Sequence, residues 1–221
     1  MRPAFVSLPP GPAPQVVCIG AHSDDIEIGC GGTLAELAAA WPTATFHCWV
    51  FSASATRAEE TRACLSQLVG AERLALQLFP FRDGFFPADW QAIKENLRAL
   101  AGSVDPALVF THRIADRHQD HRLLAELTWN HFRQHPVLEY EIVKYEGDLG
   151  EPNLYVPISG PVVERKCAAL LDCFASQRAK PWFTRSTFEA IARLRGVESN
   201  SPSGFAEAFH ARKVVTSFAL G

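Results

Sequence analysis

Short apolar runs rich in β-branched and aromatic residues recur along the first two thirds of the chain, a pattern typical of buried strands. Between them lie segments with apolar side chains at helical spacing. The predicted strands are residues 16–21, 45–52, 74–79, 107–111 and 137–144. The predicted helices are residues 31–41, 56–69, 88–100 and 122–132. Strand and helix therefore alternate, which predicts an α/β fold with right-handed crossovers and a mostly parallel five-stranded sheet.

This alternation stops after residue 144. The remaining residues read as loops, one extended piece and helices, so we interpret residues 145–221 as a small C-terminal cap that packs on the sheet without folding independently. The first 14 residues contain five prolines, which predicts an extended, flexible arm. We therefore predict a single domain with an arm at residues 1–14, an α/β core at residues 15–144 and the cap.

Charge and composition narrow the range of partners. The chain of 221 residues has a formal net charge of −3 and a pI near 6.2, which argues against nucleic acid or an anionic membrane surface as a partner. No window holds 18 consecutive apolar residues and no signal-peptide core is present, which favours a cytoplasmic location. The six cysteines are scattered and form no Cys-x-x-Cys pair, so we predict reduced, buried thiols.

Candidate chemistry begins directly after the first predicted strand, at His22-Ser23-Asp24-Asp25. Open α/β sheets bind their ligands at the carboxyl ends of the strands. An imidazole and a carboxylate from one turn can hold zinc, and a second carboxylate is then free for proton transfer. Adjacent aspartates point in different directions, so one of them would ligate and the other would act as the base.

A second group of ligand-type residues follows the fourth predicted strand, namely His112, Asp116, His118, Asp120 and His121. Loops after parallel strands converge at one edge of the sheet, so we expect the two groups to meet. Together they offer three zinc ligands and leave the fourth position to water, as in catalytic zinc sites. Either group alone would more simply be read as turn and helix-cap residues. The presence of both, in this order, favours a metal site.

The segment from Ala21 to Leu34 closely resembles the His-Pro-Asp-Asp-x-Glu-hydrophobic-Gly-x-Gly-Gly signature of the PIG-L/LmbE-like zinc deacetylases. Asp116-x-His118-x-Asp120-His121 is similar to the second motif of that family. The family removes N-acetyl groups from N-acetylglucosamine-type sugars and conjugates. We therefore expect a Rossmann-like three-layer fold and one Zn²⁺ per chain, with another divalent metal as the alternative.

The resemblance also implies roles for individual residues. The implied metal ligands are His22, Asp25 and His121. The implied catalytic residues are Asp24 as general base, His118 as oxyanion stabiliser or general acid, and Asp120 as the residue that orients His118. Arg57 and Asp83 are similar to the sugar-binding positions of the family. Ser23 replaces the usual proline, which changes the stiffness of the turn but removes no ligand.

Two features of the first motif have competing interpretations. Glu27 would either orient the zinc ligands from behind or be a charge at a helix N-terminus. The glycine-rich segment at residues 29–32 would either cradle a phosphate or allow a helix to pack closely. It lacks the third glycine of a dinucleotide fingerprint and the Lys-Ser/Thr of a P-loop, which favours close packing.

We predict a zinc-dependent hydrolase that removes the N-acetyl group from an N-acetylglucosamine-type amino sugar or its conjugate. One alternative is a zinc amidase that acts on another N-acyl or thiol conjugate. The alternative of a different class is a non-catalytic sugar- or nucleotide-binding module. The sequence leaves open which sugar is used and whether the chain forms a homo-oligomer.

Overall fold

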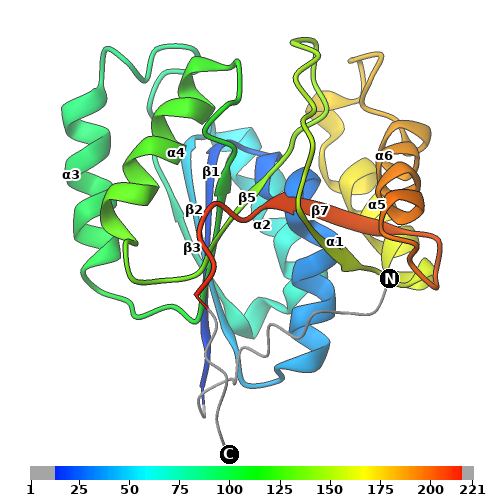
Figure 1. Cartoon of the computed structure of the whole chain (residues 1–221). Helices are drawn as coiled ribbons and strands as arrows, with labels where there is room; N and C mark the ends of the chain where they lie inside the picture. Colours follow the sequence, from blue (N-terminus) through cyan, green and yellow to red (C-terminus); the bar gives the residue numbers. More distant parts are fainter. Residues whose placement is uncertain (1–12, 216–221) are drawn as a thin grey trace, which may run out of the picture.

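The computed structural model describes residues 13–215, so the predicted arm lies almost entirely outside the described residues. In this range one sheet of seven strands separates two layers of helices (Figure 1). The strands are β1 (Gln15–His22), β2 (Thr45–Ser52), β3 (Leu74–Leu78), β4 (Leu108–His112), β5 (Val137–Tyr140), β6 (Leu154–Pro157) and β7 (Ala206–His210). The α-helices are α1 (Asp25–Ala40), α2 (Ala55–Val69), α3 (Trp90–Ala101), α4 (Gln119–His131), α5 (Gly160–Cys173) and α6 (Arg185–Glu198). Two short 3₁₀ helices are η1 (Ala71–Arg73) and η2 (Ala175–Gln177).

The sheet has the strand order β3-β2-β1-β4-β5-β7-β6. Its first five strands pair in parallel, which confirms the predicted α/β architecture. The predicted number of five strands was too small, because the region from residue 145 onward adds β7 antiparallel to β5 and β6 antiparallel to β7. These two strands have only five and four residues, and neither contains a long apolar run that would reveal it in the sequence.

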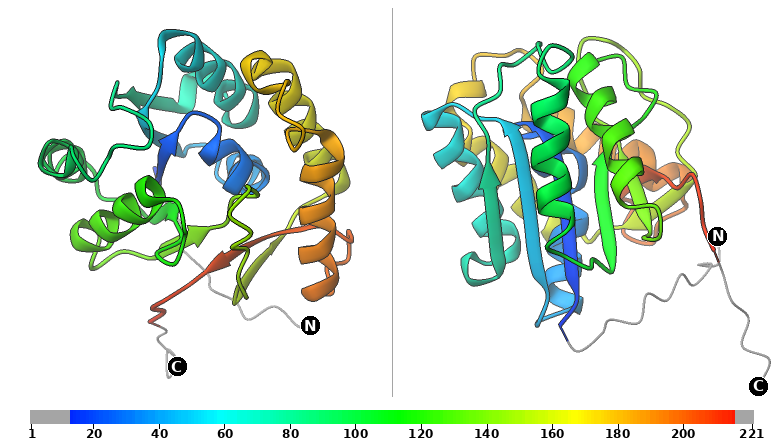
Figure 2. Two further views of the ribbon diagram at one scale, coloured as in Figure 1. Left: turned by 90° about the horizontal axis from the view of Figure 1, so that it is seen from above. Right: turned by 90° about the vertical axis from the view of Figure 1, so that its left-hand side faces the viewer.

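Helices cover both faces of the sheet and give the predicted three layers. Helices α3 and α4 lie on one face, and α1, α2, α5 and α6 lie on the other (Figures 1 and 2). Side chains of β1 alternate between the two cores, with Val17 and Ile19 facing α3 and α4 and Val16 and Cys18 facing the opposite layer. Burial on both faces explains why this strand reads as a continuous apolar run. Among the described residues, no helix combines the length and apolarity needed to cross a membrane.

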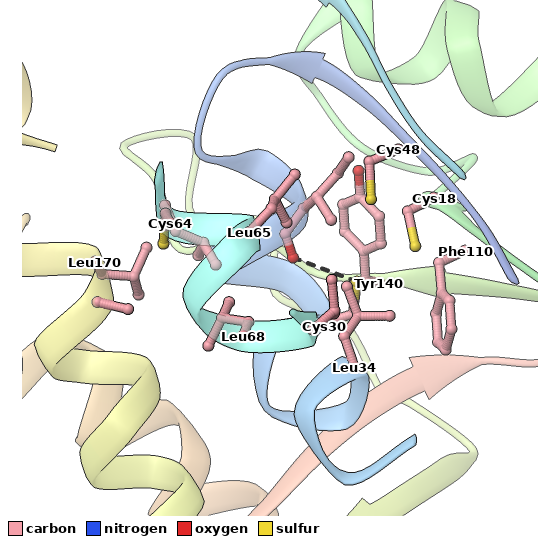
Figure 3. Close-up of a cluster of buried hydrophobic side chains, with 14 of the residues drawn as sticks. Cys18, Cys30, Leu34, Cys48, Cys64, Leu65, Leu68, Phe110, Tyr140 and Leu170 are labelled. Carbon is pink, nitrogen blue, oxygen red and sulfur yellow. Dashed lines mark hydrogen bonds between the residues drawn. The ribbon is translucent and has the colours of Figure 1, made fainter. Parts of the chain in front are cut away.

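The larger core contains most of the cysteines. Cys18, Cys30 and Cys48 lie near Tyr140, and Cys64, on α2, lies on the other side of the same cluster near Leu170 (Figure 3). Cys167 is also buried, and Cys173 is half-buried. The predicted burial of the thiols is therefore confirmed for five of the six, and burial raises the pKa of the Cys18 and Cys64 thiols well above the usual value.

The glycine-rich segment lies inside α1, which begins at Asp25 and not near Gly31 as predicted. A Cβ atom built on Gly29 would lie 2.3 Å from the Tyr140 ring, and one on Gly32 would lie 2.8 Å from the Glu207 carboxylate. The Glu207 carboxylate accepts hydrogen bonds from the backbone N–H groups of Gly32 and Thr33. The glycines thus serve close packing, which confirms that interpretation of the motif.

Substituting Gly29 by alanine should lower the free energy of unfolding by about 1–3 kcal/mol, the usual cost of overpacking a core. The Tyr140 ring has little freedom to yield, because its hydroxyl donates to the Ile19 carbonyl at 2.6 Å. Urea denaturation measures the effect. Gly160→Ala is the matched control, since a Cβ atom there meets nothing within 4 Å. Equal stability of the two variants would contradict the packing argument.

Candidate metal and catalytic site

The two groups of ligand-type residues meet at the carboxyl edge of the sheet. Strand β1 ends at His22 and the neighbouring strand β4 ends at His112, so the turns that follow them lie side by side. Helix α4 begins at Gln119, which places Asp120 and His121 in its first turn and not in a loop. The predicted convergence of the two motifs is therefore present in the structure.

Three ligand atoms form a compact triangle at this edge. His22 Nδ1 lies 3.4 Å from Asp25 Oδ2 and 3.2 Å from His121 Nε2, and the third side, from His121 Nε2 to Asp25 Oδ2, is 3.5 Å. Four-coordinate zinc with ligands at about 2.0–2.1 Å separates its ligand atoms by about 3.3–3.4 Å. The spacing of the three atoms matches that geometry.

The opposite nitrogens of the two imidazoles are held by carboxylates. His121 Nδ1 lies 3.1 Å from Asp116 Oδ2, and His22 Nε2 lies 3.0 Å from Asp83 Oδ1 and 3.2 Å from Asp120 Oδ2. Such partners place the ring protons on the outer nitrogens, which leaves the lone pairs of the facing nitrogens free. Two lone pairs and a carboxylate oxygen then converge on one point, which suits a divalent cation.

His112 lies beside this triangle but serves a different purpose. Its ring stacks on His121 with centroids 3.9 Å apart, and its Nε2 accepts a hydrogen bond from the Ala21 backbone N–H at 2.9 Å. Complete burial lowers the pKa of His112 to about 4 and keeps the imidazole neutral. With the Nε2 lone pair engaged, His112 is a buried support behind the triangle, although it belongs to the ligand-type residues of the second group.

Asp24 faces the cavity beside the triangle without being part of it. Its backbone has a positive φ of 93°, which is uncommon for a residue with a side chain and is found mainly where function requires it. Arg57 holds this turn, because its Nη2 lies 3.0 Å from Asp24 Oδ1 and also donates to the Ser23 carbonyl. Burial raises the pKa of the Asp24 carboxyl to about 7, although the Arg57 charge opposes the change.

Asp120 has partners other than the predicted one. Its carboxylate accepts hydrogen bonds from the backbone N–H groups of Gly84 at 2.6 Å and Phe86 at 3.1 Å, in addition to its contact with His22. Its link to His118 is a backbone one, in which the Asp120 N–H donates to His118 Nδ1 at 3.3 Å. The carboxylate thus orients His22 and the loop after β3, whereas the backbone amide orients His118.

Glu27 is completely buried in the first turn of α1, and neither carboxylate oxygen has a hydrogen-bond partner among the described residues. Burial raises its pKa well above the usual value. Glu27 is therefore not a charge at a solvated helix end. It also shows no hydrogen bond to a residue of the ligand triangle, so its predicted role in orienting the ligands stays a prediction.

A cavity of about 490 Å³ opens above the triangle. His22, Asp24, Asp25, Arg57, Asp83, His118 and His121 all contribute to its wall. Sequence reasoning missed the wall residues that follow β5, because loops carry no periodic pattern by which they could be placed. These residues include Lys144, Tyr145, Glu146, Lys180 and Trp182.

Comparison with known families gives a match to the family described as PIG-L: GlcNAc-PI de-N-acetylase over residues 17–132. A relative is the protein called uncharacterized deacetylase YaiS from Escherichia coli (strain K12). The two are 31% identical over 134 residues, which cover 57% of this chain and 72% of that protein.

Two solved structures illustrate the similarity of the fold. The first is GalB, the 4-carboxy-2-hydroxymuconate hydratase of Pseudomonas putida, with a TM-score of 0.70, 18% identity and coverage of 94% of this chain and 100% of that one. The second is the N,N'-diacetylchitobiose deacetylase of Pyrococcus horikoshii, with a TM-score of 0.68, 19% identity and coverage of 93% and 87%. At these identities the likeness concerns the fold alone.

Proposed function

Because this chain belongs to the PIG-L family, we propose that it is a zinc-dependent hydrolase that removes the N-acetyl group from an N-acetylglucosamine-type amino sugar or its conjugate. The observation that carries the proposal is the triangle of ligand atoms from His22, Asp25 and His121 beside the non-ligating carboxylate of Asp24. Zinc is the expected metal, and another divalent ion is the alternative. A cytoplasmic location and a single-domain organisation stay predictions.

His22, Asp25 and His121 would hold the divalent ion, which would supply Lewis-acid polarisation of the amide carbonyl and would lower the pKa of the attacking water. Asp24 accepts a proton from the attacking water and returns it to the departing amine. His118 Nδ1 accepts the Asp120 amide hydrogen, so the proton of the neutral ring lies on Nε2, where it can donate to the developing oxyanion. Burial lowers the pKa of His118, which favours this neutral form.

Arg57 and Asp83 are the proposed contacts to the sugar, since both line the cavity and the Asp83 side chain is exposed. The fold alone does not select the reaction, because a hydratase has the same fold. An amidase that acts on another N-acyl or thiol conjugate uses the same residues, and only the substrate distinguishes it. A non-catalytic sugar- or nucleotide-binding module has no need for a base beside three metal ligands.

His121→Ala should remove most of the bound metal and, with it, acetate release from N-acetylated sugars. The wild-type chain should hold about one divalent ion, and the loss of one of three protein ligands weakens such a site severely. Elemental analysis and an acetate assay measure the two effects separately. His135→Ala is the control, because this histidine pairs with the exposed Asp105 outside the cavity. Full metal content in His121→Ala would refute the ligand assignment, and metal without acetate release would favour the binding module.

A further inference from the structure

Two thiols outside the cavity lie together where α2 packs against α5. Cys64, on α2, is completely buried, and Cys173, the last residue of α5, is half-buried. The two cysteines are far apart in the sequence and form no Cys-x-x-Cys motif, so only the packing of the two helices brings them together. The proposed deacetylation uses neither of them.

The facing sides of the two helices fix the positions of both thiols. On α2, Cys64 and Gln67 are three residues apart and therefore lie on one face of the helix. On α5, Leu170 and Cys173 share a face for the same reason. Figure 3 shows Cys64 near Leu170, and the Gln67 side-chain amide donates to Cys173 Sγ at 3.3 Å. Cys173 therefore points toward α2, beside Cys64.

The surroundings of Cys173 favour its thiolate, the form in which cysteine reacts. Hydrogen bonding to the Cys64 thiol lowers the pKa of Cys173 to about 7. Burial and the carboxylates of Asp172 and Glu60 act in the opposite direction but are outweighed. At the end of α5, Arg178 Nη2 donates to the Asp172 carbonyl at 3.0 Å, which offsets the negative end of the helix dipole beside the thiol.

Cys173 differs from other cysteines of the chain in exposure and in pKa. Cys167, earlier on the same helix, is buried, and burial raises the pKa of its thiol. Burial also raises the pKa of the Cys64 thiol. Buried thiols of this kind are inert toward solutes. Cys173 is therefore the thiol that a small oxidant in solution reaches, and Cys64 is the thiol beside it.

We propose that Cys173 and Cys64 are a peroxide-sensitive thiol pair, in which Cys173 reacts first and Cys64 closes a disulfide between α5 and α2. The Cys173 thiolate attacks one oxygen of hydrogen peroxide, the O–O bond breaks, and the products are a sulfenic acid and hydroxide. The hydroxide takes up the proton that the Cys173 thiol released. The Cys64 sulfur then attacks the Cys173 sulfur as its own proton leaves, the S–O bond breaks, and water departs. Two thiols are oxidised by two electrons, and the peroxide is reduced to water.

The test treats the reduced, metal-loaded protein with hydrogen peroxide and maps every cysteine by mass spectrometry. The wild-type chain should lose the mass of two hydrogen atoms and yield one cross-linked pair of peptides, which contain Cys64 and Cys173. The remaining cysteines should stay reduced. Cys64→Ser should stop at a sulfenic acid on Cys173, which dimedone captures, and Cys173→Ser should leave Cys64 reduced.

The matched control is Cys167→Ser, because it removes a buried thiol from the same helix and should form the disulfide at the wild-type rate. Gln67→Leu should slow the oxidation several-fold, since the Cys173 thiolate loses a hydrogen-bond donor. Alkylation of Cys173 by iodoacetamide should rise with pH around a midpoint of about 7. A midpoint at the ordinary value for cysteine would contradict the reactive thiolate.

The wild-type measurement does not depend on whether any variant folds. Peroxide treatment that leaves Cys173 reduced, or that oxidises Cys167 as readily, would overturn the assignment of the reactive thiol. A sulfinic acid at Cys173 without a link to Cys64, or a disulfide that joins two chains through Cys173, would overturn the pair.

Discussion

Asp24→Asn should lower kcat by about 10²–10⁴-fold, the usual contribution of a general base, and should leave the metal content unchanged. The Asp24 carboxylate faces the cavity, but its oxygens are not part of the ligand triangle. An amide of the same shape can still accept the hydrogen bond from Arg57, which lies 3.0 Å from Oδ1. The substitution therefore removes proton transfer while it preserves the strained turn.

The neighbouring substitution Asp25→Asn is the matched comparison, because Asp25 Oδ2 is one corner of the triangle and also accepts the His22 backbone N–H at 2.7 Å. It should lose metal as well as activity. Elemental analysis and steady-state kinetics on both variants separate the two roles. Metal loss in Asp24→Asn with metal retained in Asp25→Asn would mean that the roles of the two aspartates are reversed.

Arg57 illustrates what a motif can and cannot predict. The resemblance implies that Arg57 contacts the sugar. In the structure its guanidinium instead bonds Asp24 and the Ser23 carbonyl and so holds the turn that they form. The guanidinium carbon Cζ also lies 5.4 Å from the centre of the Phe174 ring. Arg57 is distant from Asp24 in the sequence and becomes its direct neighbour because α2 packs beside α1. The sequence offered no means of identifying Asp24 as the partner of Arg57.

The parallel core and the meeting of the two groups of ligand-type residues could be predicted because both depend on local patterns. Strands that are buried on both faces are continuous apolar runs, and the two groups of ligand-type residues follow β1 and β4. The carboxyl ends of these strands are neighbours because the two strands pair in parallel. The partners of Asp120 could not be predicted, because they are backbone amides of the loop after β3. The cavity wall that follows β5 and the wall between α5 and α6 could not be predicted either, because both depend on how these two loops fold against the sheet.

A buried ion pair that joins α5 and β7 to α1 was also beyond prediction. Lys166 Nζ lies 2.6 Å from Glu207 Oε1 and also donates to the Ile28 carbonyl at 2.6 Å. The Glu207 carboxylate accepts a hydrogen bond from the Gly32 N–H. In a regular α-helix this N–H would donate to the Ile28 carbonyl. The Lys166–Glu207 pair therefore hydrogen-bonds both of these backbone groups. The contact between Lys166 and Glu207 forms only because the sheet extends to β7.

Lys166→Met should therefore lower the free energy of unfolding by about 3–5 kcal/mol, because it leaves the Glu207 carboxylate buried without its countercharge. Lys166→Met/Glu207→Gln should recover part of that loss, since no isolated charge remains in the core. Urea denaturation of the two variants measures the difference. Glu164→Gln is the control, because it breaks a pair with Arg185 that lies exposed at the surface and should scarcely change the denaturation midpoint.

Metal binding provides a second measurement on the same variants. Helix α1 holds Asp25 in its first turn, and the ion pair bonds the Ile28 carbonyl and the Gly32 N–H farther along the same helix. Loosening the helix at these positions should therefore weaken metal affinity along with stability. If the double variant is as unstable as Lys166→Met, the destabilisation comes from lost packing and hydrogen bonds and not from an isolated charge. If both variants are destabilised and still bind metal with wild-type affinity, the ion pair stabilises the fold without positioning the ligands.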